Sequence, residues 1–302
     1  MRIRDKIKKP QRPVVAYEIL PPREKDGTLN SYAETISSLL SQTHIDAINI
    51  PEVHDEVGRG DRPVVNQKRG EPREFGMLLQ DIVGIEAIIN RVVVHDPYDK
   101  QMKWLEETNT KYEIENMIIV GGESSKVSYP GPTVNEALKA ITDKYNQNGG
   151  NIFCGGIAIP SRKEESKNLI KKSDNGSEFF TTQVLYDSNN IIKMINNYQE
   201  RCDELDTFPR RILLSFAPVS SQKNVEFLKW LGVEIPDDTE KYLQARPGSM
   251  TERSLDVSIE VLNEILNYIQ ENDLRVPVGL NVEHIMSYNF QSSVEMLQEL
   301  AR

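Results

Sequence analysis

Two residues of the sequence place a polar side chain inside a strand-like run. Glu18 stands in YEILPP, and Gln183 interrupts the aromatic and β-branched run EFFTTQVLYD. A carboxyl group enclosed by protein is desolvated, so its pKa rises and it becomes suited to general acid catalysis. A Glu18 paired with a nearby cation is the alternative. An amide carries donors and an acceptor, which suits the edge of a heterocycle, and a hydrogen-bonded core glutamine is the alternative for Gln183.

Other polar residues follow apolar runs or lie on a predicted helix. Glu123 comes after two glycines, where a ligand can approach the backbone, and its carboxylate is suited to accept from an N–H-rich heterocycle. A solvated turn is the alternative. His95, in VVVHDP, is a candidate contact for a ring or a phosphate, or else a core histidine bonded to a carbonyl. Lys171 and Lys172, with Asn168 one turn earlier, are candidates for holding a phosphate, or else belong to a solvated helix face.

Eight short apolar runs recur along the chain, and most are continuous, as is typical of strands covered on both faces. They are Val14–Leu20, Ile45–Ile50, Arg91–His95, Asn116–Gly122, Asn151–Ile159, Phe179–Tyr186, Arg211–Ala217 and Val276–Val282. Segments with helical spacing lie between or after them: Leu29–Ser41, Phe75–Ile89, Thr133–Tyr145, Glu164–Lys172, Asn189–Leu205, Gln222–Trp230, Leu255–Ile269 and Val294–Ala301. This alternation predicts an α/β fold, a single (β/α)8 TIM barrel over residues 1–302 with a short basic N-terminal extension, residues 1–13.

In such a barrel the active site lies at the C-terminal ends of the strands. The polar residues expected there are Glu18, Asn49, Glu52, His95, Glu123, Ser161, Gln183, Ser215 and Asn281. They come from all eight runs, so the sequence predicts one polar site at the mouth of the barrel.

Composition excludes several classes of function. The chain has 302 residues, a hydrophobic content of 38% and a net charge of −10, so we expect neither nucleic acid nor an anionic membrane as a partner. The two cysteines lie far apart and the four histidines lack ligand spacing, so we expect no metal site and a reducing, cytoplasmic location. The basic N-terminus has no apolar segment behind it, so we expect no secretory signal. The chain has no glycine-rich Rossmann or P-loop motif.

Four stretches in this order resemble the methylenetetrahydrofolate reductase family. They are YEILPP, FFTTQVLYD, LLSFAPVS (Leu213–Ser220) and LGVEIPDD (Leu231–Asp238), and the resemblance runs from about Val14 to Leu300. The family is a (β/α)8 barrel that reduces 5,10-methylenetetrahydrofolate to the 5-methyl form. In its usual form NADH or NADPH reduces bound FAD, and the flavin then passes hydride to the folate.

The resemblance assigns roles residue by residue. Glu18 matches the catalytic acid, and Glu123 stands where the family has an Asp near flavin and pterin. Gln183 matches a folate-binding amide, and Asn49 and Ser215 are expected beside the substrate. His95 matches a flavin-contacting histidine. The residues that match those around the FAD phosphates and adenosine are Asn168, Lys171 and Lys172.

Departures from the family pattern affect the flavin pocket. A Thr-Tyr pair is replaced at Ile50-Pro51, an Arg by Gly121 and a Tyr by Ile159, while Gln222 stands where the family has an aromatic residue. The ILLSF, IPSR and DRP stretches look similar to a flavin-independent branch in which hydride passes directly from NAD(P)H to the folate. FAD use and direct transfer therefore both remain open.

Two alternatives to a reductase are considered. One is a pterin-binding methyl-transfer protein on the same barrel, and the other is a non-catalytic subunit of a reductase complex. Glu18 argues against the first, and the retention of Glu18, Glu123 and Gln183 argues against the second. A homo-oligomer or a partner reductase subunit is possible in either case.

Overall fold

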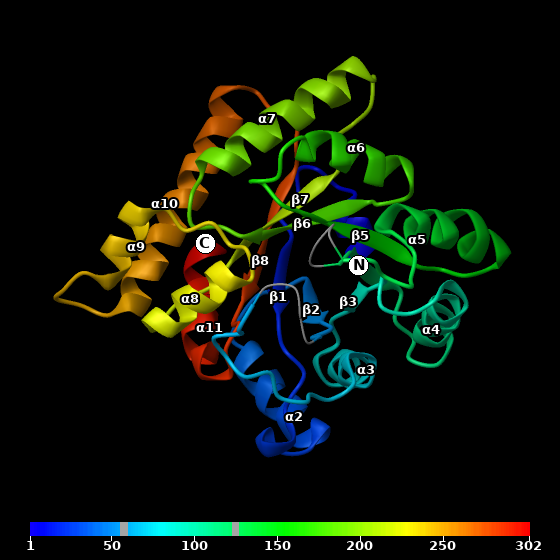
Figure 1. The fold of residues 1–302 in the computed structure, drawn as a ribbon, viewed down its shortest axis with the longest axis horizontal. Helices are drawn as coiled ribbons and strands as arrows, with labels where there is room; N and C mark the ends of the chain where they lie inside the picture. Colours follow the sequence, from blue (N-terminus) through cyan, green and yellow to red (C-terminus); the bar gives the residue numbers. More distant parts are fainter. Residues whose placement is uncertain (55–59, 123–126) are drawn as a thin grey trace.

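A closed barrel of eight parallel strands forms the centre of the computed structural model, which describes residues 1–54, 60–122 and 127–302 (Figure 1). The strands are β1 (Val15–Glu18), β2 (Ala47–Pro51), β3 (Ala87–Val92), β4 (Asn116–Val120), β5 (Phe153–Ala158), β6 (Phe179–Val184), β7 (Arg211–Phe216) and β8 (Val278–Glu283). Each strand pairs with the next, and β8 pairs with β1. The predicted (β/α)8 barrel is confirmed.

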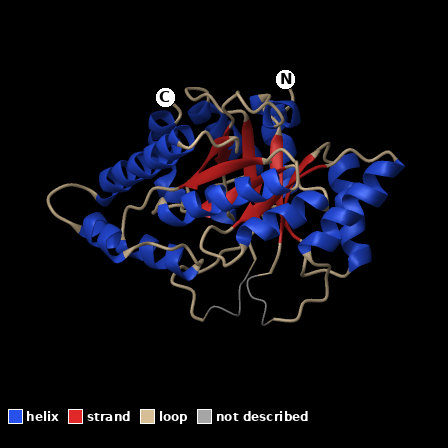
Figure 2. Cartoon of the chain, turned by 90° about the horizontal axis from the view of Figure 1, so that it is seen from above, coloured by secondary structure: helices blue, strands red, loops and turns tan. Residues whose placement is uncertain are grey.

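Helices surround the strands on the outside of the barrel, except for α1, which lies at its N-terminal end (Figure 2). They are α1 (Ile3–Ile7), α2 (Leu29–Leu40), α3 (Pro72–Val83), α4 (Tyr98–Thr110), α5 (Val134–Ala140), α6 (Glu165–Asp174), α7 (Asn189–Glu204), α8 (Gln222–Trp230), α9 (Asp237–Gln244), α10 (Met250–Glu271) and α11 (Phe290–Leu300). Three of them begin at a hydroxyl cap. Thr28, Thr133 and Ser249 each accept a hydrogen bond from a backbone N–H in the first turn, which satisfies a donor that the helix leaves free.

The region around β3 differs from the sequence-based expectation. The predicted helix Phe75–Ile89 extends too far and the predicted strand Arg91–His95 begins too late, because α3 ends at Val83 and β3 spans Ala87–Val92. Gly84 is the physical cause: it ends the helix in the left-handed conformation, φ 71°, which glycine adopts without a Cβ penalty. The polar helix α4 was also missed, since it carries a weak apolar stripe.

Side chains that point into the barrel form two layers. The lower layer is apolar and contains Ala16, Ala47, Ile88, Ile118, Phe153, Phe179 and Leu213. Successive side chains of a strand alternate between faces, so the inward position two residues further along each strand lies nearer its C-terminal end. Those positions hold Glu18, Asn49, Asn90, Val120, Gly155, Thr181 and Ser215. The upper layer is therefore polar on most strands.

Helix α1 covers the N-terminal end of the barrel. Its Ile3 and Ile7 are 1% and 3% exposed and pack against the apolar lower layer. Arg211, at the start of β7, fixes the end of α1 and the segment after it. Its buried guanidinium donates to the carbonyl oxygens of Ile7, Lys9 and Val278. Burial lowers the pKa of Arg211 to about 10, which leaves it charged at neutral pH.

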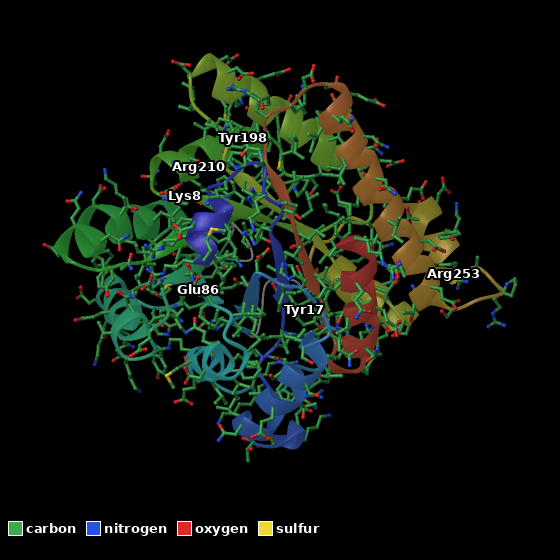
Figure 3. All side chains as sticks on the ribbon, turned by 180° about the vertical axis from the view of Figure 1, so that it is seen from behind. Lys8, Tyr17, Glu86, Tyr198, Arg210 and Arg253 are labelled. Carbon is green, nitrogen blue, oxygen red and sulfur yellow. The ribbon has the colours of Figure 1, made fainter. Side chains whose placement is uncertain are left out.

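Basic residues of the same segment pair with carboxylates at this end. Lys6 lies 2.7 Å from Asp46, and Lys8 lies 3.5 Å from Glu178. Figure 3 views the molecule from this end, with Lys8 at the end of α1 and Glu86 close by. Residues 1–13 are thus packed against the base of the barrel.

We expect Ile7→Ala to lower the free energy of unfolding by about 2–5 kcal/mol, because it leaves a cavity between α1 and the lower layer. The midpoint of urea unfolding measures this loss. Leu205→Ala is the control: Leu205 is 55% exposed, so its truncation should change stability by less than about 0.5 kcal/mol. Equal losses in the two variants would contradict the closing role of α1.

Candidate active site

Glu18 ends β1 with its carboxyl group among asparagine amides. Its Oε2 accepts from Nδ2 of Asn49 at 2.8 Å and from Nδ2 of Asn90 at 3.5 Å. Burial among protein atoms raises the pKa of Glu18 to about 7, although the amide hydrogen bonds act in the opposite direction. The side chain remains partly exposed. A proton is therefore held near neutral pH at a group that a ligand can reach.

A second carboxyl group, Glu283, lies beside Glu18. The two residues are register partners on the neighbouring strands β1 and β8. Nδ2 of Asn281 donates to Oε1 of Glu283 at 3.1 Å and to Oγ of Ser215 at 3.0 Å. Ser215 Oγ is in turn 3.2 Å from Thr181 Oγ1. Burial, and next the proximity of Glu18, raise the pKa of Glu283 well above its ordinary value.

Sequence reasoning missed Glu283 and Asn90. The last predicted apolar run ends at Val282, one residue before Glu283, and the predicted third strand begins at Arg91, one residue after Asn90. A signal was present for Glu283, because it follows Asn281 by two residues and therefore shares its inward face. Of the predicted site residues, the structure brings together Glu18, Asn49 and Ser215 in this upper layer.

Two amide oxygens of the upper layer lack a donor. Oδ1 of Asn49 and Oδ1 of Asn90 are buried and accept no hydrogen bond from the part of the chain that the structure describes. A buried acceptor without a partner costs about 1–3 kcal/mol. The layer is therefore suited to a ligand that presents N–H donors.

His95 stands in a different group from Glu18. It lies three residues beyond the end of β3, and its ring centroid is 4.6 Å from that of His54 and 5.5 Å from that of Tyr129. The expectation that His95 ends a strand is wrong, but the histidine does lie in an aromatic cluster. Whether it contacts a cofactor stays a prediction. Glu123 lies outside the described residues.

Arg91 anchors the carboxylate next to this cluster. It donates to Glu52 at 2.5 Å, to Asp96 at 2.8 Å and to Gln101 at 3.0 Å. Burial acts to raise the pKa of Glu52, but the hydrogen bond from His54 and the charge of Arg91 outweigh it, and the pKa is lowered. Glu52 is thus an ionised carboxylate at the same end of the barrel as Glu18.

A cleft of about 860 Å³ opens between the chain segments that follow β1 and β2. Its lining includes Pro21, Pro22, Glu52, His54 and Arg69. Arg69 donates from Nη1 to the carbonyl oxygen of Pro21 at 2.8 Å. The cleft is large enough to admit a sizeable organic ligand beside the strand that carries Glu18.

Gln183 is hydrogen-bonded within the protein. Its Nε2 donates to the carbonyl oxygen of Leu231 at 3.1 Å, and it lines a small cavity of about 30 Å³ together with Ser161 and Tyr186. The β6–β7 pairing shifts register between Thr181 and Val184, next to this residue. The structure therefore provides a protein partner for the amide, and its role in ligand binding stays a prediction.

The three residues expected around a phosphate do not point to one place. Lys172 is buried and donates to the carbonyl oxygen of Ile157 at 2.5 Å and to Glu165 at 3.2 Å, and burial lowers its pKa. Asn168 donates to the same Glu165 at 2.9 Å. Lys171 is exposed. Only Lys171 presents its charge to solvent.

The described residues lack a metal-binding cluster and a membrane-spanning helix. Residues 1–54, 60–122 and 127–302 contain no group of three or more His, Cys, Asp or Glu side chains arranged to hold a metal ion. Within the same ranges, every helix is too short or too polar to span a bilayer.

We expect Glu52→Gln to flatten the loss of thermal stability in acid. Because the folded-state pKa of Glu52 lies below its unfolded value of about 4.3, its charge stabilises the protein above that pH, and the contribution is lost as pH falls through the folded pKa. The melting temperature, measured from neutral pH downward, checks this. The exposed Glu24→Gln serves as the control, and an unchanged acid slope in Glu52→Gln would contradict the assignment.

A family model, a curated protein and a solved structure are similar to this chain to different extents. A family model described as methylenetetrahydrofolate reductase matches residues 2–299. A protein of Schizosaccharomyces pombe named methylenetetrahydrofolate reductase 1 is 24% identical over 176 residues, which cover 54% of this chain and only 26% of that protein. A solved structure from Clostridium thermocellum, an uncharacterized protein described as binding two copies of 5-methyl-5,6,7,8-tetrahydrofolic acid, superposes with a TM-score of 0.78 at 22% identity, over 99% of this chain and 98% of the other.

Proposed function

The chain belongs to the methylenetetrahydrofolate reductase family, and we propose that it reduces 5,10-methylenetetrahydrofolate, or a related pterin, to the 5-methyl form with NADH or NADPH. The observation that carries the proposal is the Glu18 carboxyl, which has a pKa of about 7 and lies in the mouth of the barrel. The description of the Clostridium thermocellum protein, which binds the product of this reaction, supports the choice of a reduced folate.

The chemistry needs an acid at the position of Glu18. The methylene carbon of the substrate is bonded to both N5 and N10, and it accepts hydride poorly while both bonds are intact. In the proposed reaction Glu18 gives its proton to N10, the bond from N10 to the methylene carbon breaks, and an N5 iminium cation forms. Hydride from the nicotinamide then adds to the methylene carbon, which yields the N5-methyl group and leaves Glu18 as a carboxylate.

The amides of the upper layer are proposed to orient the pterin. Oδ1 of Asn49 and Oδ1 of Asn90 are buried acceptors, and a reduced pterin carries ring N–H and amino donors that match them. Ser215 supports the layer through Asn281. Gln183 is a further proposed pterin contact, for which its amide must exchange the bond to Leu231 for one to the ligand.

FAD, which the family implies, does not fit the residues that would hold its phosphates. Lys172 already donates to Ile157 and Glu165, and Asn168 donates to Glu165 as well. Gly121 and Ile159 offer no polar side chain where the family has Arg and Tyr. We therefore propose direct hydride transfer from NADH or NADPH, and the protein's task is to hold the donor ring against the pterin.

Glu18→Gln is expected to retain folate binding and to lose about 10²–10⁴-fold in turnover, because the amide keeps the shape and cannot supply the proton. Steady-state oxidation of NAD(P)H in the presence of methylenetetrahydrofolate measures turnover, and calorimetry measures binding. Glu295→Gln, an exposed change on α11, is the matched control. Near-normal turnover of Glu18→Gln would remove Glu18 from the acid role.

Protein purified without added flavin is expected to be colourless and to oxidise NADH or NADPH once methylenetetrahydrofolate is present. The absorption spectrum and the same assay check both points. A yellow preparation with stoichiometric FAD contradicts direct transfer. Activity that appears only after FAD is added indicates a weak flavin site instead. Protein that binds folate yet stays inactive with every donor favours a methyl-transfer protein or a non-catalytic subunit.

A further inference from the structure

The carboxyl groups of Glu18 and Glu283 face the same space inside the barrel. The residues pair across β1 and β8, and hydrogen-bonded strands lie about 4.8 Å apart. We propose that Glu283 and Glu18 form an acid pair. In this pair Glu283 is a positioning residue, which keeps a proton available to Glu18 during the reaction. The proposal deepens the function proposed above and rests on it for the identity of the proton acceptor.

A chain of amides connects the two carboxyl groups. Asn281 donates from Nδ2 to Oε1 of Glu283, and its Oδ1 accepts from Nδ2 of Asn49 at 3.4 Å. Asn49 donates its other hydrogen to Oε2 of Glu18. The donors described here reach Oε2 of Glu18 and Oε1 of Glu283, and a protonated carboxyl group can carry its proton on the second oxygen.

The groups that surround the pair offer no compensating charge. Neither carboxyl forms an ion pair within the described part of the chain, and Asn49, Asn281 and Ser215 are neutral. From β8, burial lowers the pKa of His284 to about 4, so the ring is neutral at neutral pH. After β6, burial raises the pKa of Tyr186, whose hydroxyl donates to the carbonyl oxygen of Ala217.

Two arginines, Arg23 and Arg69, act by their charge on His284, which follows Glu283. Arg23 is engaged by both oxygens of Asp26, and Arg69 donates to the carbonyl oxygen of Pro21. Two like-charged carboxylates at neighbouring positions repel each other, so ionisation of one opposes ionisation of the other. The pair therefore retains at least one proton over a wider pH range than a single carboxyl would.

The proton balance of a turnover uses both residues. Glu18 transfers its proton to N10 and becomes a carboxylate. Glu283, whose side chain is partly exposed at the mouth, takes a proton from solvent and passes a proton to Glu18, which returns the pair to its starting protonation state. One proton is consumed for each hydride delivered, which matches the net reaction.

The pair can be detected without any substrate. Infrared titration of protein carrying ¹³C-labelled glutamate should show a protonated carboxylic acid in the ligand-free wild type at about pH 8, above the pKa of an isolated glutamate. Glu283→Gln and Glu18→Gln should each lose that band, because either change leaves one carboxyl without its like-charged neighbour. Glu52→Gln is the matched control and should keep the band, since Glu52 is paired with Arg91.

Any other outcome of the titration contradicts the proposed acid pair. A wild type without the band has no retained proton. A band lost only in Glu18→Gln indicates that Glu18 titrates alone, and a band kept in both variants belongs to another residue. Melting temperatures establish that each variant is folded. Because folate and nicotinamide are absent, the titration can succeed or fail independently of the proposed reaction.

Turnover provides the second readout. The alkaline limb of kcat against pH should move down by about one pH unit or more in Glu283→Gln, while kcat at acidic pH changes little. A merely structural role would lower kcat at every pH and would leave the limb in place, which contradicts the proposal. If no variant or wild type reduces folate but the infrared band behaves as expected, the pair stands and the proposed reaction fails.

Discussion

The desolvation of two carboxyl groups at the mouth of the barrel is the constraint on which the site depends. A glutamate in water is ionised at neutral pH and is a poor proton donor. Enclosure by the strands raises the pKa of Glu18 to about 7, and the amides that surround it carry no charge to reverse the shift. The barrel thus makes an ordinary glutamate into an acid.

This enclosure requires a solid barrel beneath the carboxyl groups. The apolar side chains of the lower layer fill the barrel, and Ile3 and Ile7 of α1 cover its N-terminal end. Arg211 ties the segment after α1 to β7 and β8 by donating to three backbone carbonyl groups. A residue far from the mouth therefore contributes to the same packed interior on which the upper layer rests.

The mouth also shows how neighbouring charges decide the state of a carboxyl group. Glu52 and Glu283 both stand at or near the end of a strand. Arg91 and His54 lower the pKa of Glu52, whereas burial and Glu18 raise that of Glu283. Carboxyl groups whose pKa values are pushed apart in this way are typical of acid and base assignments in enzyme sites. Arg91 is buried and donates to Glu52, so this carboxylate has a cationic partner, whereas Glu18 and Glu283 are surrounded by neutral amides and hydroxyls.

The sequence by itself determined the barrel, the inward Glu18, the amide of Asn49 and the hydroxyl of Ser215, because apolar runs that alternate with helical segments, and polar residues at strand ends, are local patterns. It misplaced β3, since Ile85 and Ile89 continue the spacing of α3 beyond the glycine that ends it. Only the tertiary structure decided that Glu283 faces Glu18, that Gln183 bonds to Leu231 and that Lys172 turns inward to Glu165. The physical reason is that register across the closing β1–β8 pair, and the partners a side chain meets there, depend on chain segments far apart in the sequence.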